Sequence, residues 1–168
     1  MKLIDLEVKN FATYKDQKWN FTKASSPVFV SGDTGSGKTT FFIDAVTSAL
    51  YGRAYGEMRP GSVKEAISSG ASQAIVKLSF EVGGERYILA RIFYLRGTSK
   101  AQLRKVSDSE DTVISSSTKE VDSKVLDLIR MEYKAFLNTV VIRQGEVASI
   151  ISKNLDPAER RQIFLDAF

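Results

Sequence analysis

The sequence of 168 residues contains neither cysteine nor histidine. Without cysteine the chain holds no disulfide and no thiolate-bound metal. Without histidine it lacks both the commonest general base and the commonest zinc ligand. Any catalysis must therefore depend on phosphate positioning, a hard metal ion and carboxylates, some of which can lie on another chain.

Long hydrophobic runs are lacking too: no apolar stretch approaches the ~20 residues of a membrane-spanning helix. The first residues alternate charged and apolar side chains, unlike a signal peptide. Apolar residues make up 43% of the chain, which predicts an ordinary globular chain that forms one domain or one lobe of a larger domain. Its 24 Lys and Arg exceed its 20 Asp and Glu, and this net charge of +4 permits contact with nucleic acid without demanding it.

One segment fits the phosphate-binding loop pattern G-x-x-x-x-G-K-[ST] at every fixed position. Its glycines let consecutive backbone N–H groups face one anion, and a helix that begins near the lysine directs its positive dipole end at the same point. The lysine supplies a mobile ammonium for the β- and γ-phosphates, and the next threonine offers a hydroxyl to Mg²⁺. We therefore expect nucleoside triphosphate binding by Gly32, Asp33, Thr34, Gly35, Ser36, Gly37, Lys38, Thr39 and Thr40.

The segments beside this loop predict the usual strand–loop–helix context. Apolar residues predict a buried strand over Val28–Ser31, directly before the loop. A helix should follow over Thr40–Leu50 and end near Tyr51, with Gly52 as its C-cap.

Alternation and turn residues predict antiparallel hairpins in the rest of the chain. Two-residue periodicity predicts a strand over Lys2–Asn10 with an antiparallel partner over Lys18–Phe21, a hairpin of Ile75–Val82 with Arg86–Leu95 around Gly83-Gly84, and a second hairpin of Ala101–Val106 with Thr112–Ile114. Helical periodicity follows Thr118, and further short elements are predicted at Tyr133–Leu137 (helix), Thr139–Ile142 (buried strand), Val147–Ile151 (helix) and Ala158–Phe168 (helix). Hairpins rather than β-α-β units follow the first helix, so we expect a mixed α/β fold in which an antiparallel sheet is inserted beside a P-loop core sheet.

Several segments together resemble the N-terminal ATPase lobe of the Rad-fifty/SbcC family, which are SMC-like, ABC-type ATPases of DNA double-strand-break repair. The resemblance covers the whole chain, and its most specific element pairs the phosphate loop with a later Q-loop segment. The segments that carry it are Leu6–Phe11, Thr34–Thr40 with Asp44-Ala45 and Ala49–Gly52, Ile67–Gly70, Asn138–Glu146 and Ser152–Phe164. The implied fold class is α/β, a P-loop NTPase: the N-terminal lobe of an ABC-ATPase head with an antiparallel β-subdomain, spanning residues 1–168 to the base of a coiled coil.

The resemblance also implies roles for particular residues. Gln144 would be a switch residue that binds Mg²⁺ together with Thr39 or orients the attacking water, whereas the plain interpretation is a polar residue at a strand end. Lys38 and Gln144 would be the catalytic residues of this lobe. Ile67, Ser68 and Ser69 would form the loop on the adenine side. Many family members carry arginine where this chain has Ala12, so Thr13, or else Tyr14 or Lys15, would take over that contact.

The family's signature motif, Walker B carboxylates, switch histidine and zinc hook are not found in this sequence. The resemblance therefore implies an intracellular protein, in cytoplasm, nucleoid or nucleus, that hydrolyses ATP only when completed by its own C-terminal lobe and by a second head in an ATP sandwich. It also implies an Mre-eleven-type nuclease and double-stranded DNA as partners, zinc only in the hook region, and no membrane. The alternatives are another SMC-like chromosome-organising head, an ABC transporter domain, or a module that binds ATP only as a structural ligand.

Two groups of basic residues are candidates for DNA contact. The first group lies on the predicted hairpins, where the plain alternative is charge on an edge strand that prevents aggregation. The second group lies on the last predicted helix, where the plain alternative is a solvent-exposed helix face. They are Arg91, Arg96, Lys100, Arg104 and Lys105, and Arg160 and Arg161.

Overall fold

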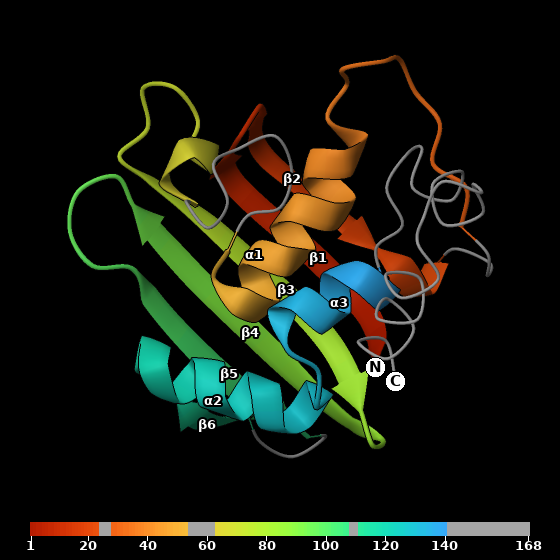
Figure 1. The fold of residues 1–168 in the computed structure, drawn as a ribbon, viewed down its shortest axis with the longest axis vertical. Helices are drawn as coiled ribbons and strands as arrows, with labels where there is room; N and C mark the ends of the chain where they lie inside the picture. Colours follow the sequence, from red (N-terminus) through yellow and green to blue (C-terminus); the bar gives the residue numbers. More distant parts are fainter. Residues whose placement is uncertain (24–27, 54–62, 108–110, 141–168) are drawn as a thin grey trace, which may run out of the picture. The chain divides into compact units, whose positions relative to one another are not determined.

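The computed structural model describes residues 1–23, 28–53, 63–107 and 111–140 (Figure 1). The chain divides into two compact units, Met1–Ile129 and Arg130–Phe168, and each is described by itself. Among the described residues, no helix has the length and apolar character needed to cross a bilayer.

The first unit contains one sheet of antiparallel strands in the order β2-β1-β3-β4-β5-β6. Its strands are β1 (Lys2–Phe11), β2 (Tyr14–Asn20), β3 (Gln73–Val82), β4 (Glu85–Tyr94), β5 (Lys100–Val106) and β6 (Asp111–Ser115). All three predicted antiparallel pairings are confirmed, although β2 begins four residues earlier than predicted. The turn between β3 and β4 requires glycine, because Gly83 and Gly84 have φ values of 61° and 80°.

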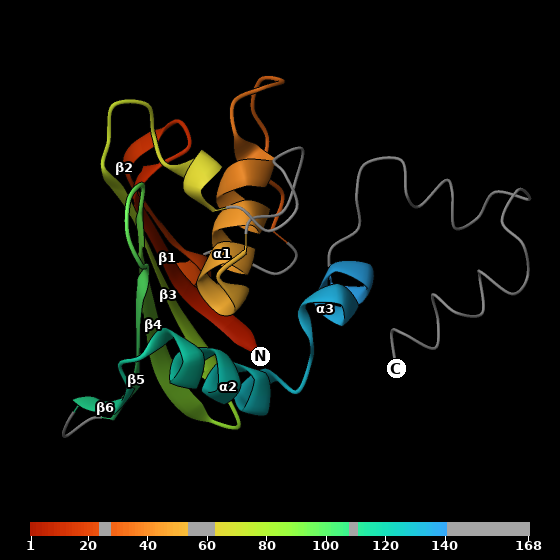
Figure 2. The ribbon, with the colours of Figure 1, turned by 60° about the vertical axis from the view of Figure 1, so that its left-hand side comes forward.

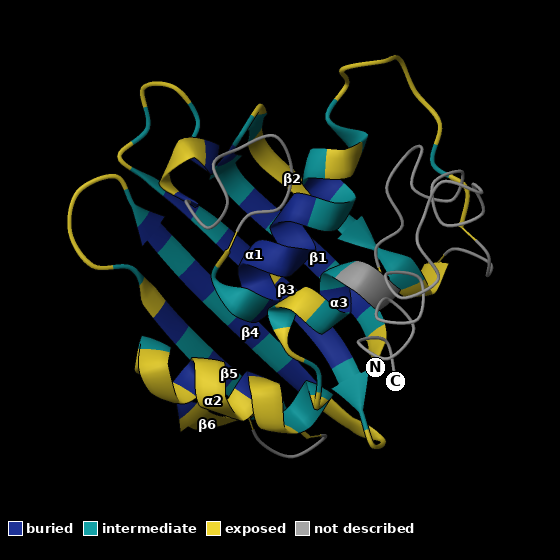
Figure 3. Cartoon of the chain, viewed as in Figure 1, coloured by how far each residue is buried: buried dark blue, intermediate teal, exposed yellow. Residues whose placement is uncertain are grey.

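Two helices cover one face of this sheet, as the view along the sheet edge shows (Figure 2). They are α1 (Ala45–Tyr51), which packs on β1, β3 and β4, and α2 (Thr118–Ile129), which packs on β5 and β6. Alternate residues of the strands point toward the helices and form the core (Figure 3), among them Leu6, Val8, Leu78, Leu89 and Leu103. Short helical turns complete the unit: η1 (Phe21–Lys23), η2 (Thr40–Asp44) and η3 (Lys64–Ala66).

The end of α1 confirms the predicted glycine cap. Gly52 has a φ of 66°, and its N–H donates to the Ser48 carbonyl at 3.0 Å. A Cβ at this position would also lie 3.2 Å from Nη1 of Arg91. The backbone conformation therefore favours glycine, and a larger residue would also require a small shift of the Arg91 side chain.

The predicted buried strand before the phosphate loop is wrong. Residues 28–33 have no regular secondary structure, and Val28 and Phe29 are 44% and 92% exposed. A strand requires a neighbour for its N–H and C=O groups, and no described residue pairs with Val28–Ser31. The described part of the chain therefore contains one continuous antiparallel sheet in place of a P-loop core sheet beside an inserted one.

The second unit is described only as far as residue 140 and contains α3 (Tyr133–Thr139), which confirms the predicted short helix. Thr139, predicted to begin a buried strand, instead ends this helix, and Val140 is 56% exposed. A residue whose backbone continues a helical turn cannot pair as a strand. The helices predicted at 147–151 and 158–168 lie outside the described residues.

Candidate nucleotide-binding site

The phosphate-loop candidate lies at the N-terminal end of the helical segment that runs into α1 (Figure 1). Gly35 and Gly37 have φ values of 81° and 86°, a left-handed conformation that favours glycine. The Ser36 N–H donates to the Asp33 carbonyl at 3.1 Å and closes the turn. A Cβ on Gly35 would meet no atom within 4 Å, so the space beside the loop is open. Alternating backbone conformations of this kind are typical of loops whose N–H groups bind an anion, which agrees with the predicted role of this segment.

The helix that follows the loop departs from the regular α-helix that the sequence predicts. Lys38 and Thr39 are helical, η2 is a five-residue π-helix, and α1 continues to Tyr51. Short π-helical segments are rare and occur often at functional sites. Phe41 of η2 is buried and donates its N–H to the Gly37 carbonyl at 2.8 Å, which ties the end of the loop to the helix.

The Lys38 ammonium lies inside the loop and is not a freely mobile charge. Its Nζ donates to the carbonyls of Gly32 at 2.6 Å and Asp33 at 2.7 Å, and to the Ser36 hydroxyl at 3.3 Å. An ammonium has three donors, so the first two bonds fix its position and the third is the longest and weakest. A phosphate oxygen in place of the Ser36 hydroxyl would use this third donor without moving the lysine.

The remaining loop residues present polar groups to solvent. Asp33, Thr34, Ser36 and Thr39 are exposed, and Thr40 is partly exposed. The Thr39 hydroxyl is therefore accessible to a metal ion held by phosphate oxygens. No cluster of acidic side chains that could hold a metal alone occurs in the described part of the chain.

The structure brings the predicted adenine-side loop against the turn between β1 and β2. The Ser68 N–H and hydroxyl donate to the carbonyls of Asn10 at 2.9 Å and Ala12 at 2.7 Å, and Ile67 forms an isolated bridge with Phe11. Ile67 is buried, whereas Thr13 and Ser69 are exposed. Of these predicted residues, Thr13 and Ser69 thus have side chains free to face a ligand, while Ile67 and Ser68 brace the turn.

Tyr14, only an alternative to Thr13 in the sequence, reaches the phosphate loop directly. Its hydroxyl donates to the Ser36 carbonyl at 3.1 Å. Its ring packs on Phe41, with centroids 5.1 Å apart. The sequence signal for this contact was weak, since Tyr14 and Ser36 are separated by 22 positions.

Asp44 is buried behind the loop, and burial raises the pKa of its carboxyl from 3.8 to about 6, opposed by a hydrogen bond with Thr40. Its Oδ1 is buried and has no hydrogen-bond partner among the described residues. Because the folded state holds this proton more tightly, the carboxyl's contribution to stability is complete below about pH 4 and is lost as the pH rises toward about 6.

Replacing Asp44 with asparagine should therefore raise the free energy of unfolding at about pH 8 by roughly 1–3 kcal/mol and leave it nearly unchanged near pH 4. Urea unfolding at several pH values measures both. The matched control is Asp127→Asn, since Asp127 lies exposed on α2. An Asp44→Asn effect that does not change with pH would contradict the assigned titration.

The comparisons with known proteins identify the family. A sequence model described as an AAA domain matches residues 5–167. The chain belongs to this AAA domain family. The match includes the phosphate-loop candidate, which therefore lies within a P-loop domain.

Relatives of this AAA domain chain are DNA-repair ATPases. It is 30% identical over 167 residues to a "Probable DNA double-strand break repair Rad50 ATPase" of Aquifex aeolicus, covering 99% of this chain and 16% of the relative. It is 32% identical over 160 residues to the Rad50 ATPase of Methanocaldococcus jannaschii, covering 95% and 14%. It is 29% identical over 170 residues to the SbcC component of the SbcCD nuclease of Deinococcus radiodurans, covering 97% and 18%. The predicted resemblance to the Rad-fifty/SbcC family is thus confirmed, and the chain spans about one sixth of the length of these relatives.

Within this AAA domain, one of the basic residues predicted to contact DNA does not lie at the surface. Arg91 is 1% exposed, so its proposed contact with DNA is wrong: it shares the inward register of Leu89 and Phe93. Arg96 and Lys100 are exposed. Gln144, Arg160 and Arg161 lie outside the described residues.

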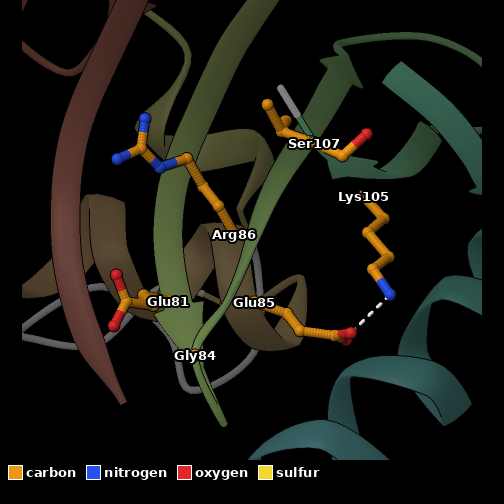
Figure 4. Close-up of a pocket in the computed structure, with 7 residues that line it drawn as sticks. Glu81, Gly84, Glu85, Arg86, Lys105 and Ser107 are labelled. Carbon is orange, nitrogen blue, oxygen red and sulfur yellow. Dashed lines mark hydrogen bonds and ion pairs between the residues drawn. The ribbon is translucent and has the colours of Figure 1, made fainter. Parts of the chain in front are cut away.

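Lys105 lies in a surface depression of about 490 Å³ beside the turn between β3 and β4 (Figure 4). It pairs there with Glu85 at 2.5 Å, and Glu81 and Arg86 line the same depression. Arg104, the residue before Lys105 on β5, forms an ion pair with Asp111 of β6, in which Nη1 and Oδ2 are 3.7 Å apart. These acidic partners offset the positive charge that the hairpins would otherwise present to phosphates.

Proposed function

We propose that this chain is the N-terminal, ATP-binding lobe of an ABC-type ATPase head that acts in DNA double-strand-break repair. The observation that supports the proposal is a complete phosphate-loop motif, with Gly35 and Gly37 in the left-handed conformation, in a chain that matches Rad50 and SbcC proteins over nearly its whole length. Residues 1–168 would form one lobe, completed by a C-terminal lobe that carries the remaining ATPase motifs.

The residues of the loop fit the needs of Mg²⁺-ATP. Backbone N–H groups of Gly35, Gly37 and Lys38 would surround the phosphates, and Lys38 would use its third donor on them. The exposed Thr39 hydroxyl would bind Mg²⁺. Gln144 would be the further magnesium ligand and the sensor of the γ-phosphate. Thr13 and Ser69 would lie on the adenine side.

Two such heads would enclose two ATP molecules, so that ATP controls association of the heads, and hydrolysis would separate them. This cycle would govern access of double-stranded DNA and of an Mre-eleven-type nuclease partner. The name of the Deinococcus radiodurans relative, a component of a nuclease, supports a nuclease partner in preference to a purely chromosome-structural role.

The test is ATP-dependent association of this chain with its C-terminal lobe, measured by light scattering with and without Mg²⁺-ATP. We expect a shift to the mass of two complete heads only when Mg²⁺-ATP is present, and no shift with AMP. Tight ATP binding without any change in mass would contradict the head-dimer mechanism and leave the chain a nucleotide-binding module.

A further inference from the structure

Tyr14, the first residue of β2, contacts the phosphate loop through its side chain. The Tyr14 hydroxyl donates to the Ser36 carbonyl at 3.1 Å, and its ring packs on Phe41 behind the loop. Partial burial raises the pKa of the Tyr14 phenol, so it remains a protonated donor at neutral pH. The tyrosine thus contacts the loop from both its hydroxyl and its ring.

Gly37 shows how closely Tyr14 approaches the loop. A Cβ at Gly37 would lie 2.8 Å from the Tyr14 hydroxyl oxygen, and two ring carbons would lie at 3.2 Å. The φ of 86° favours glycine at this position, and a larger side chain there would also displace the end of the Tyr14 side chain. The fixed glycine of the phosphate-loop pattern has a second, local reason in this chain.

The hydrogen bond determines which way one peptide group faces. In a trans peptide the C=O of one residue and the N–H of the next point in opposite directions. Holding the Ser36 carbonyl toward Tyr14 therefore turns the Gly37 N–H away from Tyr14. The proposed function makes this N–H one of the donors to the phosphates. If the peptide rotated, a carbonyl oxygen would face the anion in place of a donor.

We propose that Tyr14 is a positioning residue of the phosphate site: its hydroxyl holds the Ser36–Gly37 peptide in the orientation that presents the Gly37 N–H to a bound phosphate chain. This inference rests on the proposed ATP-binding function. The turn that precedes Tyr14 is itself held in place, because the Ala12 N–H donates to the Ala66 carbonyl at 2.5 Å and the Ser68 hydroxyl donates to the Ala12 carbonyl. Tyr14 therefore connects the loop to a part of the sheet whose position is fixed by hydrogen bonds.

The experiment compares Tyr14→Phe with wild type for binding of ATP and of inorganic pyrophosphate by calorimetry. Phenylalanine keeps the ring contact with Phe41 and removes only the hydroxyl. The loss of one hydrogen bond to the loop should weaken binding about three- to tenfold, and equally for both ligands because the effect is on the phosphates. The amide resonance of Gly37 should also shift less on addition of pyrophosphate than in wild type.

The matched control is Tyr87→Phe, which removes a tyrosine hydroxyl that donates to Glu85 at 2.7 Å and does not contact the loop. It should bind both ligands like wild type. The urea midpoint of each variant is measured without ligand, so that a loss of affinity at an unchanged midpoint is assigned to the loop and not to general instability.

Each remaining outcome counts against the inference. If Tyr14→Phe bound pyrophosphate as tightly as the wild-type chain does, the positioning role of Tyr14 would be overturned. The proposed function would still stand in that case, provided that the wild-type chain binds ATP. Loss of ATP affinity alone would assign Tyr14 to the adenosine end of the ligand and equally overturn the positioning role. Failure of the wild-type chain to bind either ligand would overturn the proposed function and the inference together.

Discussion

Replacing Lys38 with alanine is expected to abolish ATP binding, weakening the affinity by at least about 100-fold. The substitution removes the charge-assisted hydrogen bond of the third donor, which contributes about 1.5–3 kcal/mol, and also the attraction between the ammonium and the negative charge of the phosphates. The substitution also frees the carbonyls of Gly32 and Asp33, which the ammonium holds in the structure. The measurement is calorimetric titration with Mg²⁺-ATP.

The stability of the chain should change far less than its affinity for ATP. The hydrogen bonds of Lys38 are exposed, so their loss should lower the free energy of unfolding by less than about 1 kcal/mol. Lys124→Ala, at an exposed lysine of α2, is the control for a general loss of positive charge. ATP affinity in Lys38→Ala equal to that of wild type would refute the assignment of the phosphate loop.

The strands of the sheet were predictable because their signals are local. Alternation in Ile75–Val82 and Arg86–Leu95, with two glycines between them, specifies a hairpin without knowledge of the rest of the fold. Val28–Ser31 has an equally clear apolar pattern, yet it forms no strand, because pairing depends on a neighbour that the pattern does not reveal. An apolar run predicts a tendency to be buried and not the partner that buries it.

The candidate site likewise has one part that local sequence signals indicate and another part that they do not. The loop from Gly32 to Thr40 could be proposed from the sequence because its motif lies in consecutive residues, and its binding of phosphate stays a prediction. The contact of Tyr14 with Ser36 and the bracing of Ala12 by Ser68 could not be proposed in this way, because they join segments 22 and 56 positions apart. The inward register of Arg91 was available from the alternation of β4, but its polar partners lie on two helices elsewhere in the chain.

Arg91 should be the residue whose replacement destabilises the first unit most among the charged residues described. It is 1% exposed, and its Nε donates to the Ala49 carbonyl at 2.5 Å and its Nη2 to the Leu50 carbonyl at 3.1 Å. The same Nη2 pairs with Asp122 of α2 at 2.6 Å. Burial lowers the pKa of Arg91 and Asp122 opposes this shift, which is consistent with a charged group that is desolvated but paired.

Arg91→Met should lower the free energy of unfolding by about 2–4 kcal/mol. Methionine fills much of the space, but it leaves two buried carbonyls at the end of α1 without a donor, each at a cost of about 1–3 kcal/mol. Denaturant unfolding followed by the fluorescence of Trp19, the single tryptophan, measures the effect. Arg91→Lys should lower the free energy of unfolding by less than Arg91→Met, because the lysine ammonium can still donate to one carbonyl at the end of α1.

Asp122→Ala separates the two contributions of Arg91 to stability, which are its ion pair with Asp122 and its hydrogen bonds to the carbonyls at the end of α1. The Asp122 side chain is 49% exposed, so water replaces much of the ion pair when the carboxylate is removed, and the loss should be about 1 kcal/mol or less. If Asp122→Ala cost as much as Arg91→Met, the ion pair and not the capping of α1 would be the dominant role. The expected order, with Arg91→Met far more destabilising, would mean that Arg91 chiefly fixes the C-terminal end of α1 to the sheet. Because the helical segment of α1 begins at the phosphate loop, such a loss of anchoring should also reduce ATP affinity, whereas Asp122→Ala should leave it unchanged.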